Sequence, residues 1–323
     1  MSGDPDAAKT LSWGSIGKSL IAGGLAGGVS RTAVAPLERL KILMQVQGSS
    51  KVYTGVWQGL KYMAKEDGFR GMMKGNGTNC VRIIPNQAVK FLTYEQLNRR
   101  LSHGMRQYGG DGQMTPLLRL VAGACAGVIG MTATYPLDMV RGRLTVQEGR
   151  SGQGRYRGIM HCTSTIVKEE GLMALWRGWL PSVIGVVPYV GLNFCVYETL
   201  KDVVLKYHGL TDERDLSIVT RLGCGAVAGT TGQTVAYPLD VVRRRLQMSG
   251  WSGASTLHAE SGTAVAYKGM TDCFARTIKE EGAQALFKGL LPNYIKVVPS
   301  IAIAFVTYEQ AKELMGVEVR ISS

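Results

Sequence analysis

Three pairs of an acid and a base recur along the chain, each behind a proline. The acid stands two residues and the base five residues after the proline, in Pro36-Glu38-Lys41, Pro136-Asp138-Arg141 and Pro238-Asp240-Arg243. Such residues can form ion pairs that break and re-form. One interpretation is a local pair on an exposed helix face, worth a few tenths of a kcal/mol. The recurring proline would bend the helix each time, which favours ion pairs between helices.

Four other bases break this repetition. Each stands at a fixed distance from a proline, and the equivalent positions of the other copies carry different residues. Arg31 corresponds to Met131 and Gln233, and Lys90 corresponds to Asn193 and Ala304. Arg82 and Lys296 are equivalent to each other and correspond to Gly185. An unpaired cation inside an apolar helix is costly, so its partner can be a solute. Four cations indicate an anion, and the arginine fork suits phosphate. For any one of them, the alternative is a side chain that reaches outward or joins another ion pair.

An apolar slot stands at the equivalent position of the second copy. Gly185 leaves room for a flat ring near the backbone, and Val186 and Tyr189 add aliphatic and aromatic contact. By spacing alone, Gly185 could equally be a helix-packing glycine. Together with the four cations, the slot favours a solute with an aromatic base and phosphates.

These residues lie on a unit of about 100 residues that occurs three times. Each copy has glycines four apart before the proline, such as Gly23 and Gly27, which predicts close helix contact. Each then has an aromatic-x-Gly triplet, an acid followed by glycine, and a base followed by glycine. We expect repeats over 17–110, 111–212 and 213–317, with short tails at 1–16 and 318–323, and a flexible insertion over 249–266.

Each copy is predicted to contain a spanning helix, a polar loop with a short amphipathic helix, and a second spanning helix. Uncharged runs such as 120–137 approach the about 20 residues that a bilayer requires. The expected architecture is therefore an all-α membrane protein with six transmembrane helices. They are predicted over 17–46, 75–101, 115–147, 178–206, 216–247 and 289–315.

Composition narrows the function classes. The formal net charge of +13 fits an anionic solute or lipid, and no nucleic-acid-binding motif is present. The six cysteines lack a CxxC spacing, so neither a metal site nor a disulfide is predicted. No P-loop, nucleophile elbow or metal cluster points to an enzyme, and no cofactor is expected. The start of the chain has no Arg-rich amphipathic run, so a cleaved presequence is not expected.

The three proline motifs, in register with the trailing glycine motifs, resemble the mitochondrial carrier family over nearly the whole chain. The resemblance implies a pseudo-threefold bundle around a central cavity, short helices on the matrix side, both termini toward the intermembrane space, and alternating access. It also implies an inner mitochondrial membrane protein that works as a monomer.

The same resemblance implies two gates. On the matrix side it pairs Glu38 with Arg141, Asp138 with Arg243, and Asp240 with Lys41, braced by Gln45 and Gln247, whereas Thr145 departs from the pattern. On the cytoplasmic side it pairs Glu95 with Lys201, Glu198 with Lys312, and Glu309 with Asn98. Because Asn98 has no charge, the cytoplasmic gate is predicted to be the weaker. Tyr94, Tyr197 and Tyr308 accompany its acids.

Glycines at helix starts are candidate lipid sites. The backbone amides there, beside Lys74, Arg177 and Lys288, suit lipid phosphates, and the resemblance implies cardiolipin. Helix capping is the simpler interpretation, and both can hold. The candidates are Gly55, Gly75, Gly158, Gly178, Gly269 and Gly289.

The cargo is expected to be an adenine nucleotide. In similar carriers, a glycine and an aliphatic residue at the place of Gly185 and Val186 accompany adenine nucleotides. The sequence segments Ser30–Arg39 and Ser182–Gly191 resemble those of adenine nucleotide carriers of plant type and of relatives that carry coenzyme A. The predicted reaction is exchange of ATP for AMP or ADP. Alternatives are transport of coenzyme A or adenosine 3′,5′-diphosphate, a proton leak, and a membrane protein without a solute path.

Overall fold

The computed structural model describes residues 13–48, 52–107, 115–147, 156–209, 216–251 and 266–315, and all regular elements within them are helical. Eight helices form six long segments: α1 (Trp13–Ala33) continued by α2 (Ala35–Val46), α4 (Asn76–Val81) continued by α5 (Ile83–Gln107), α6 (Pro116–Val146), α8 (Trp179–His208), α9 (Ile218–Met248) and α11 (Leu290–Leu314). The short helices are α3 (Val56–Met72), α7 (Ile159–Glu170) and α10 (Met270–Glu281), with 3-10 turns η2 (Leu172–Trp176) and η5 (Ala283–Phe287). The predicted six long segments and three short helices are therefore present.

Both long segments of the first repeat are interrupted near their prolines. The α1/α2 boundary directly precedes Pro36, and the α4/α5 boundary lies at Arg82, three residues before Pro85. A proline removes one helical hydrogen bond and crowds the carbonyl four residues earlier, which accounts for both places. In the other repeats, Pro136 and Pro188 lie within continuous helices.

The long helices differ in how apolar they are. Within the described residues, three segments are long and apolar enough to cross a membrane, namely Leu118–Val146, Leu172–Tyr207 and Ala283–Leu314. The uncharged run 222–239 of α9 does not meet this criterion because it is rich in glycine, threonine and other weakly apolar residues. Helices around a water-filled path need not be apolar on every face.

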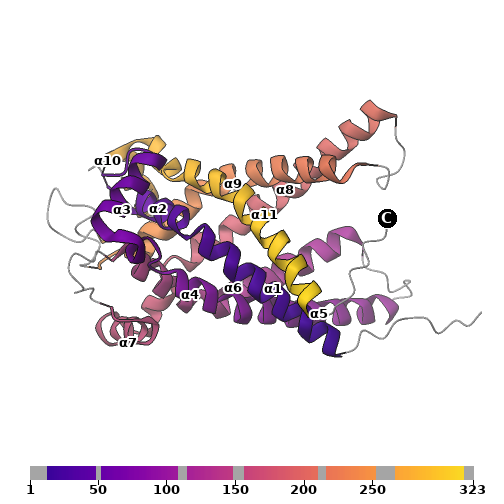
Figure 1. Ribbon diagram of the computed structural model, residues 1–323, viewed down its shortest axis with the longest axis horizontal. Helices are drawn as coiled ribbons and strands as arrows, with labels where there is room; N and C mark the ends of the chain where they lie inside the picture. Colours follow the sequence, from indigo (N-terminus) through magenta and orange to yellow (C-terminus); the bar gives the residue numbers. More distant parts are fainter. Residues whose placement is uncertain are drawn as a thin grey trace, which may run out of the picture.

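The short helices gather at one end of the bundle, which we call the capped end (Figure 1). The opposite end, which we call the far end, is formed by the ends of long helices alone, on the right of Figure 1. Neighbouring helices of different repeats pack along one another: α8 along α9, α11 along α1, and α5 along α6. The bundle is therefore a ring of three repeats.

Close helix contact occurs at other small residues than predicted. A Cβ added at Gly23, Gly123, Gly127, Gly225 or Gly229 would meet no atom within 4 Å, and only Gly27 faces a neighbour. The close approaches lie six residues before the prolines. In the second repeat, Gly130 faces Asn86. In the third, a Cβ on Gly232 would lie 2.9 Å from the Tyr189 carbonyl oxygen. In the first, the Ser30 hydroxyl donates to the Ser300 carbonyl at 2.6 Å. The predicted close contact is therefore present at Gly27 and wrong at the other five glycines, because small size does not say which face meets a neighbour.

Buried ion pairs fasten each short helix to a long one. The partners are Arg39 with Asp67, Arg143 with Glu170, and Arg245 with Glu281. Burial of the Glu281 carboxyl favours its neutral form, but Arg245 and Lys288 outweigh burial and hold its pKa below the ordinary value. This ion pair therefore stabilises the fold at neutral pH and loses its contribution as pH falls through that lowered pKa.

A base beside each of these acids also reaches the next repeat. Lys74 donates to the Gln147 carbonyl at 3.5 Å, Arg177 to that of Ser249 at 3.3 Å, and Lys288 to that of Gly48 at 3.0 Å. The capped end is thus joined by a threefold set of contacts between repeats. The predicted tails lie largely, and the insertion over 249–266 mostly, outside the described residues.

Candidate functional site

The three ion pairs between repeats are present at the capped end. Arg141 lies 2.8 Å from Glu38, Arg243 2.5 Å from Asp138, and Lys41 2.8 Å from Asp240. Each base belongs to a different repeat from its acid, so the local i, i+3 interpretation is wrong for these residues. Each acid lies two residues and each base five residues after its proline, so the three pairs lie at equivalent positions of the three repeats.

Two glutamines support two of the pairs. Gln45 donates to Asp240 at 2.9 Å, and Gln247 donates to Asp138 at 3.0 Å. The Thr145 hydroxyl instead donates to the Arg141 carbonyl of its own helix at 2.7 Å. The Glu38 pair therefore has no glutamine at the equivalent position, as the sequence predicts.

Of the four bases that break the repeat, Arg31, Arg82, Lys90 and Lys296, two already have an acidic partner in the protein. Arg82 lies 3.0 Å from Asp138, and Lys296 contacts Glu38. The expectation that all four lack an acid is therefore corrected: each of these two long side chains reaches the proline-motif acid of the next repeat. The residue of the second repeat that is equivalent to Arg82 and Lys296 is Gly185, which has no side chain to reach Asp240.

The other two cations have no ion-pair partner among the described residues. Arg31 donates to the Asn79 side chain at 2.8 Å, and that amide carries no charge. Lys90 packs its aliphatic stem where a side chain at Gly130 would stand, and no hydrogen bond of its ammonium group to a described residue is found. These two cations keep their charge available to a solute.

Three cavities connect the predicted solute residues. A cavity of about 250 Å³ is lined by Arg31, Arg82 and Lys296, and one of about 520 Å³ by Arg82, Lys90, Val186 and Tyr189. A third, of about 240 Å³, is lined by Gly185, Val186 and Tyr189. Because Arg82 lines the first two and Val186 and Tyr189 line the last two, the cavities are neighbours, and together we call them the solute path. All seven predicted solute residues lie on it.

The cavity at one end of the path has a surplus of cations, whereas the cavity at the other end is mostly uncharged but includes Lys41, Asp240 and Arg243. Arg31, Arg82 and Lys296 gather in one cavity, whereas Gly185 and Leu239 lie in the one that is mostly walled by uncharged side chains. A Cβ at Gly185 would lie 3.6 Å from Leu239 Cβ, which is ordinary contact, so the glycine is not required by helix packing. The arrangement can hold an anionic group at one end and a flat apolar group at the other.

Comparison with known proteins identifies the family. The family model described as "Mitochondrial carrier protein" matches residues 12–105, 112–208 and 214–318. The chain belongs to the mitochondrial carrier family. As such it is a multi-pass protein of the inner mitochondrial membrane, and its relatives are named as transporters rather than enzymes.

Individual carriers are similar over most of the chain. The mitochondrial adenine nucleotide transporter ADNT1 of Arabidopsis thaliana is 60% identical over 98% of this chain and 92% of its own length. The mitochondrial adenyl nucleotide antiporter SLC25A24 of Homo sapiens is 39% identical over 93% of this chain, and the calcium-binding mitochondrial carrier protein SCaMC-2-A of Danio rerio is 38% identical over 94%. The chain spans 58% and 60% of the length of these two vertebrate carriers.

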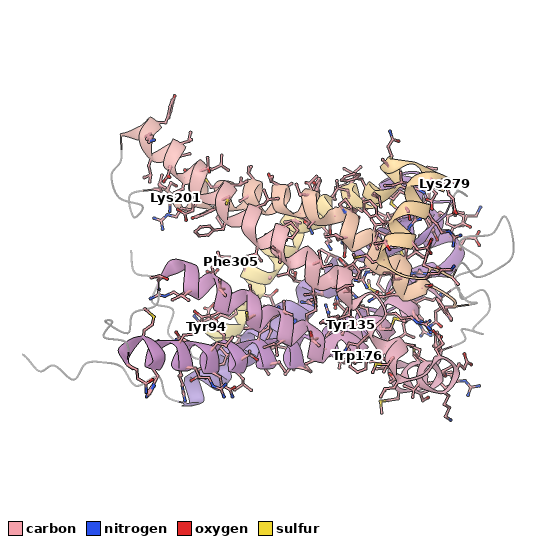
Figure 2. The ribbon with its side chains drawn as sticks, turned by 180° about the vertical axis from the view of Figure 1, so that it is seen from behind. Tyr94, Tyr135, Trp176, Lys201, Lys279 and Phe305 are labelled. Atoms are coloured by element: carbon pink, nitrogen blue, oxygen red, sulfur yellow. The ribbon has the colours of Figure 1, made fainter. Side chains whose placement is uncertain are left out.

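At the far end of this carrier, acids have local partners. Glu95 binds Arg99 at 2.5 Å and Glu198 binds Lys201 at 2.5 Å, each on its own helix, in place of the partners predicted from other repeats. Lys201 lies over the Tyr197 ring and Lys312 over the Tyr308 ring. Figure 2 shows why the predicted partners do not meet: Tyr94 on α5 and Lys201 on α8 lie apart at the far end. The predicted pairs of Glu95 and Glu198 are not formed in this conformation, and no hydrogen bond joins Glu309 to Asn98, both of which lie among the described residues.

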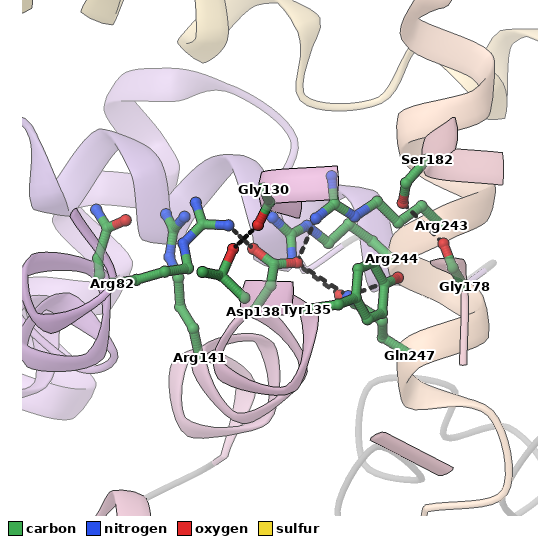
Figure 3. A network of polar contacts seen from close by, with 12 residues as sticks. Arg82, Gly130, Tyr135, Asp138, Arg141, Gly178, Ser182, Arg243, Arg244 and Gln247 are labelled. Atoms are coloured by element: carbon green, nitrogen blue, oxygen red, sulfur yellow. Dashed lines mark hydrogen bonds and ion pairs between the residues drawn. The ribbon is translucent and has the colours of Figure 1, made fainter. Parts of the chain in front are cut away.

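Sequence reasoning missed Arg244 of this carrier. Its guanidinium lies 3.2 Å from Asp138 and donates to Gln247 at 2.8 Å, so Asp138 is surrounded by the three arginines of Figure 3 that contact it, Arg82, Arg243 and Arg244. The equivalent residues in the other repeats are Ile42 and Gly142. That difference between copies was the signal that could have found it.

The glycines at helix starts have a structural reason. Gly75, Gly178 and Gly289 have φ near +80°, +83° and +87°, and a Cβ on Gly178 would lie 2.8 Å from the Arg243 carbonyl oxygen. Each therefore requires glycine for its conformation and for contact with the next repeat. Gly178 and Gly269 also line one cavity of about 470 Å³ between the second and third repeats.

Proposed function

We propose that this carrier exchanges adenine nucleotides, ATP against AMP or ADP, by alternating access to its central cavity. The observation that supports this most is the series of neighbouring cavities that extends from Arg31, Arg82 and Lys296 to the slot of Gly185. A nucleotide has the same polarity, with phosphates at one end and a base at the other. The names of the plant and human relatives, which describe nucleotide transport, agree with this cargo.

The three ion pairs at the capped end serve as the matrix gate in this proposal. With them formed and the far end held by local contacts, the structure corresponds to the state that receives solute from the intermembrane space. Glu95, Glu198 and Glu309, with Lys201, Lys312 and Asn98, would meet only in the opposite state. Breakable ion pairs suit such a gate because their energy depends on precise contact.

Phosphate binding would weaken the matrix gate directly. Arg82 and Lys296 contact gate acids, so a phosphate that draws them away lowers the positive charge that holds Asp138 and Glu38 in place. Binding energy of the solute can then drive opening, because it differs between the two states. Arg31 and Lys90 contact no acid among the described residues and can bind the phosphates without that exchange.

We further infer that the working unit is one chain that binds cardiolipin. The whole solute path is built from the helices of a single chain, so no second copy is needed to complete it. The cavity at Gly178 and Gly269 has the amides of a helix start beside Arg177, which suits a lipid phosphate. The equivalent pairs would be Gly75 with Gly158 and Gly289 with Gly55.

Ligand-dependent stability tests the cargo. Purified protein in detergent is expected to unfold at a higher temperature with ATP, ADP or AMP at about 100 times Kd, because a ligand bound only to the folded state then adds about 2.7 kcal/mol. Inorganic phosphate and a nucleoside without phosphate serve as matched partial ligands and are expected to stabilise less. Equal stabilisation by coenzyme A would support the alternative cargo, and none by any nucleotide would contradict the proposal.

Filling the slot at Gly185 is expected to stop nucleotide transport. In Gly185→Arg the new guanidinium would stand where Arg82 and Lys296 stand in the other repeats, reach Asp240, and occupy the space of the base. We expect at least a 100-fold loss of ATP uptake into liposomes with folding retained. Gly185→Ala is the matched control, since its Cβ makes only ordinary contact with Leu239, and it should keep most of the uptake. Equal uptake by both variants would show that the base binds elsewhere.

A further inference from the structure

The three gate acids differ in how many side chains bind them. Asp138 is contacted by three arginines and Gln247, and Glu38 by Arg141 and Lys296. Asp240 is contacted only by Lys41 and Gln45 among the described residues. The reason lies in the repeat, because the long cation that would reach Asp240 is replaced by Gly185.

One oxygen of Asp240 is open to the base slot. Lys41 at 2.8 Å and Gln45 at 2.9 Å both bind Oδ2, and no described residue donates to Oδ1. The Asp240 side chain is 26% exposed, against 1% for Asp138, and Oδ1 is not among the buried polar atoms without a partner. Asp240 lines the same cavity as Gly185, Val186 and Tyr189. The open oxygen therefore faces space that a solute can enter.

The chemistry of this oxygen restricts what it can bind. An ionised carboxylate only accepts hydrogen bonds, so its partner must be a donor. A metal ion is a poor fit, because one free oxygen beside the cations Lys41 and Arg243 does not provide the several oxygen ligands that magnesium or calcium requires. A neutral amino group on a flat ring satisfies both the carboxylate and the apolar walls.

We propose that Asp240 Oδ1 accepts a hydrogen bond from the 6-amino group of a purine seated against Gly185, and so selects adenine over 6-oxo purines. This inference rests on the proposed nucleotide exchange. At the edge formed by N7 and position 6, adenine presents an amino donor, whereas guanine and hypoxanthine present only acceptors, which a carboxylate repels. Gln233 lines the same cavity, but an amide both donates and accepts and therefore does not discriminate.

The preference can be measured as a ratio of uptake rates. Liposomes loaded with ADP are given labelled ATP, inosine triphosphate, or the triphosphate of unsubstituted purine riboside. A hydrogen bond to a charged group corresponds to about 10- to 100-fold, so ATP is expected to enter at least about 10-fold faster than inosine triphosphate, with the unsubstituted purine between them. This series needs no variant, so it tests the inference even where Asp240 cannot be replaced without unfolding.

Variants separate selection from gating. Asp240→Asn presents an amide that can donate to a 6-oxo group, so the ATP-to-inosine-triphosphate ratio is expected to fall toward one. Glu38→Gln neutralises the equivalent gate acid of another repeat, which does not line this cavity, and should lower both rates while keeping the wild-type ratio. An unchanged ratio in Asp240→Asn, or a wild-type ratio of one, would overturn the inference alone. If wild-type protein exchanges no nucleotide at all, the proposed function fails with it.

Discussion

Replacing Arg82 by alanine is expected to stop ATP uptake while the protein still folds. Arg82 lines both the cavity of Arg31 and Lys296 and the cavity of Lys90 and Tyr189, so it lies where the phosphates must pass. Loss of two charge-assisted hydrogen bonds of roughly 1.5 kcal/mol each predicts a decrease of about 100-fold or more. Initial rates of labelled ATP uptake into liposomes measure the effect.

The fold should tolerate this change because Asp138 keeps other partners. Arg243 and Arg244 remain in contact with it, and Gln247 still donates to it. Arg100→Ala removes an exposed base of the same helix α5 and should leave uptake unchanged. Arg82→Lys should restore part of the rate, since it keeps the charge but loses the fork. Normal uptake by folded Arg82→Ala protein would exclude Arg82 from the solute site.

Neutralising Asp138 is expected to give the largest loss of stability. Its side chain is 1% exposed, and Arg82, Arg243 and Arg244 lie within 3.2 Å of its oxygens. Asp138→Asn would leave these cations together without their acid, and breaking a buried ion pair in this way costs about 3–5 kcal/mol. Thermal unfolding in detergent should show a fall in Tm of roughly 10 °C.

The exposed pair of Glu280 with Arg276 provides the matched control. These side chains lie 3.1 Å apart on one helix turn, and such surface pairs contribute about 0–1 kcal/mol, so Glu280→Gln should leave Tm nearly unchanged. Arg244→Gln added to Asp138→Asn removes one surplus cation and should recover part of the loss. If Asp138→Asn unfolds at the wild-type temperature, the charges around Asp138 do not hold the capped end together.

The periodic features were predictable from the sequence. Three copies of one motif fix the number of long helices, and the resemblance to mitochondrial carriers then assigned the pairs of Glu38, Asp138 and Asp240, which the structure contains. Comparing equivalent positions of the three copies also predicted that Arg31 and Gly185 both line the solute path. Roles in gating, solute binding and lipid binding stay predictions.

Other features depend on side-chain reach and on conformation. Whether Arg82 and Lys296 are free depends on how far each side chain extends toward the next repeat, which residue spacing along one helix does not give. The partners of Glu95 depend on which end of the bundle is closed, and one sequence encodes both states. The helix face of small residues such as Gly123 is equally set by tertiary packing.

The most direct test of adenine nucleotide exchange is counterflow of labelled ATP in liposomes that contain the purified protein. Separate batches are loaded with AMP, ADP, coenzyme A, phosphate or buffer alone, and liposomes carrying Gly185→Arg protein serve as the matched blank. We expect rapid ATP entry only when AMP or ADP is inside, with little entry into liposomes loaded with buffer. Entry driven by coenzyme A alone, or entry that ignores the internal solute, would contradict the proposed exchange.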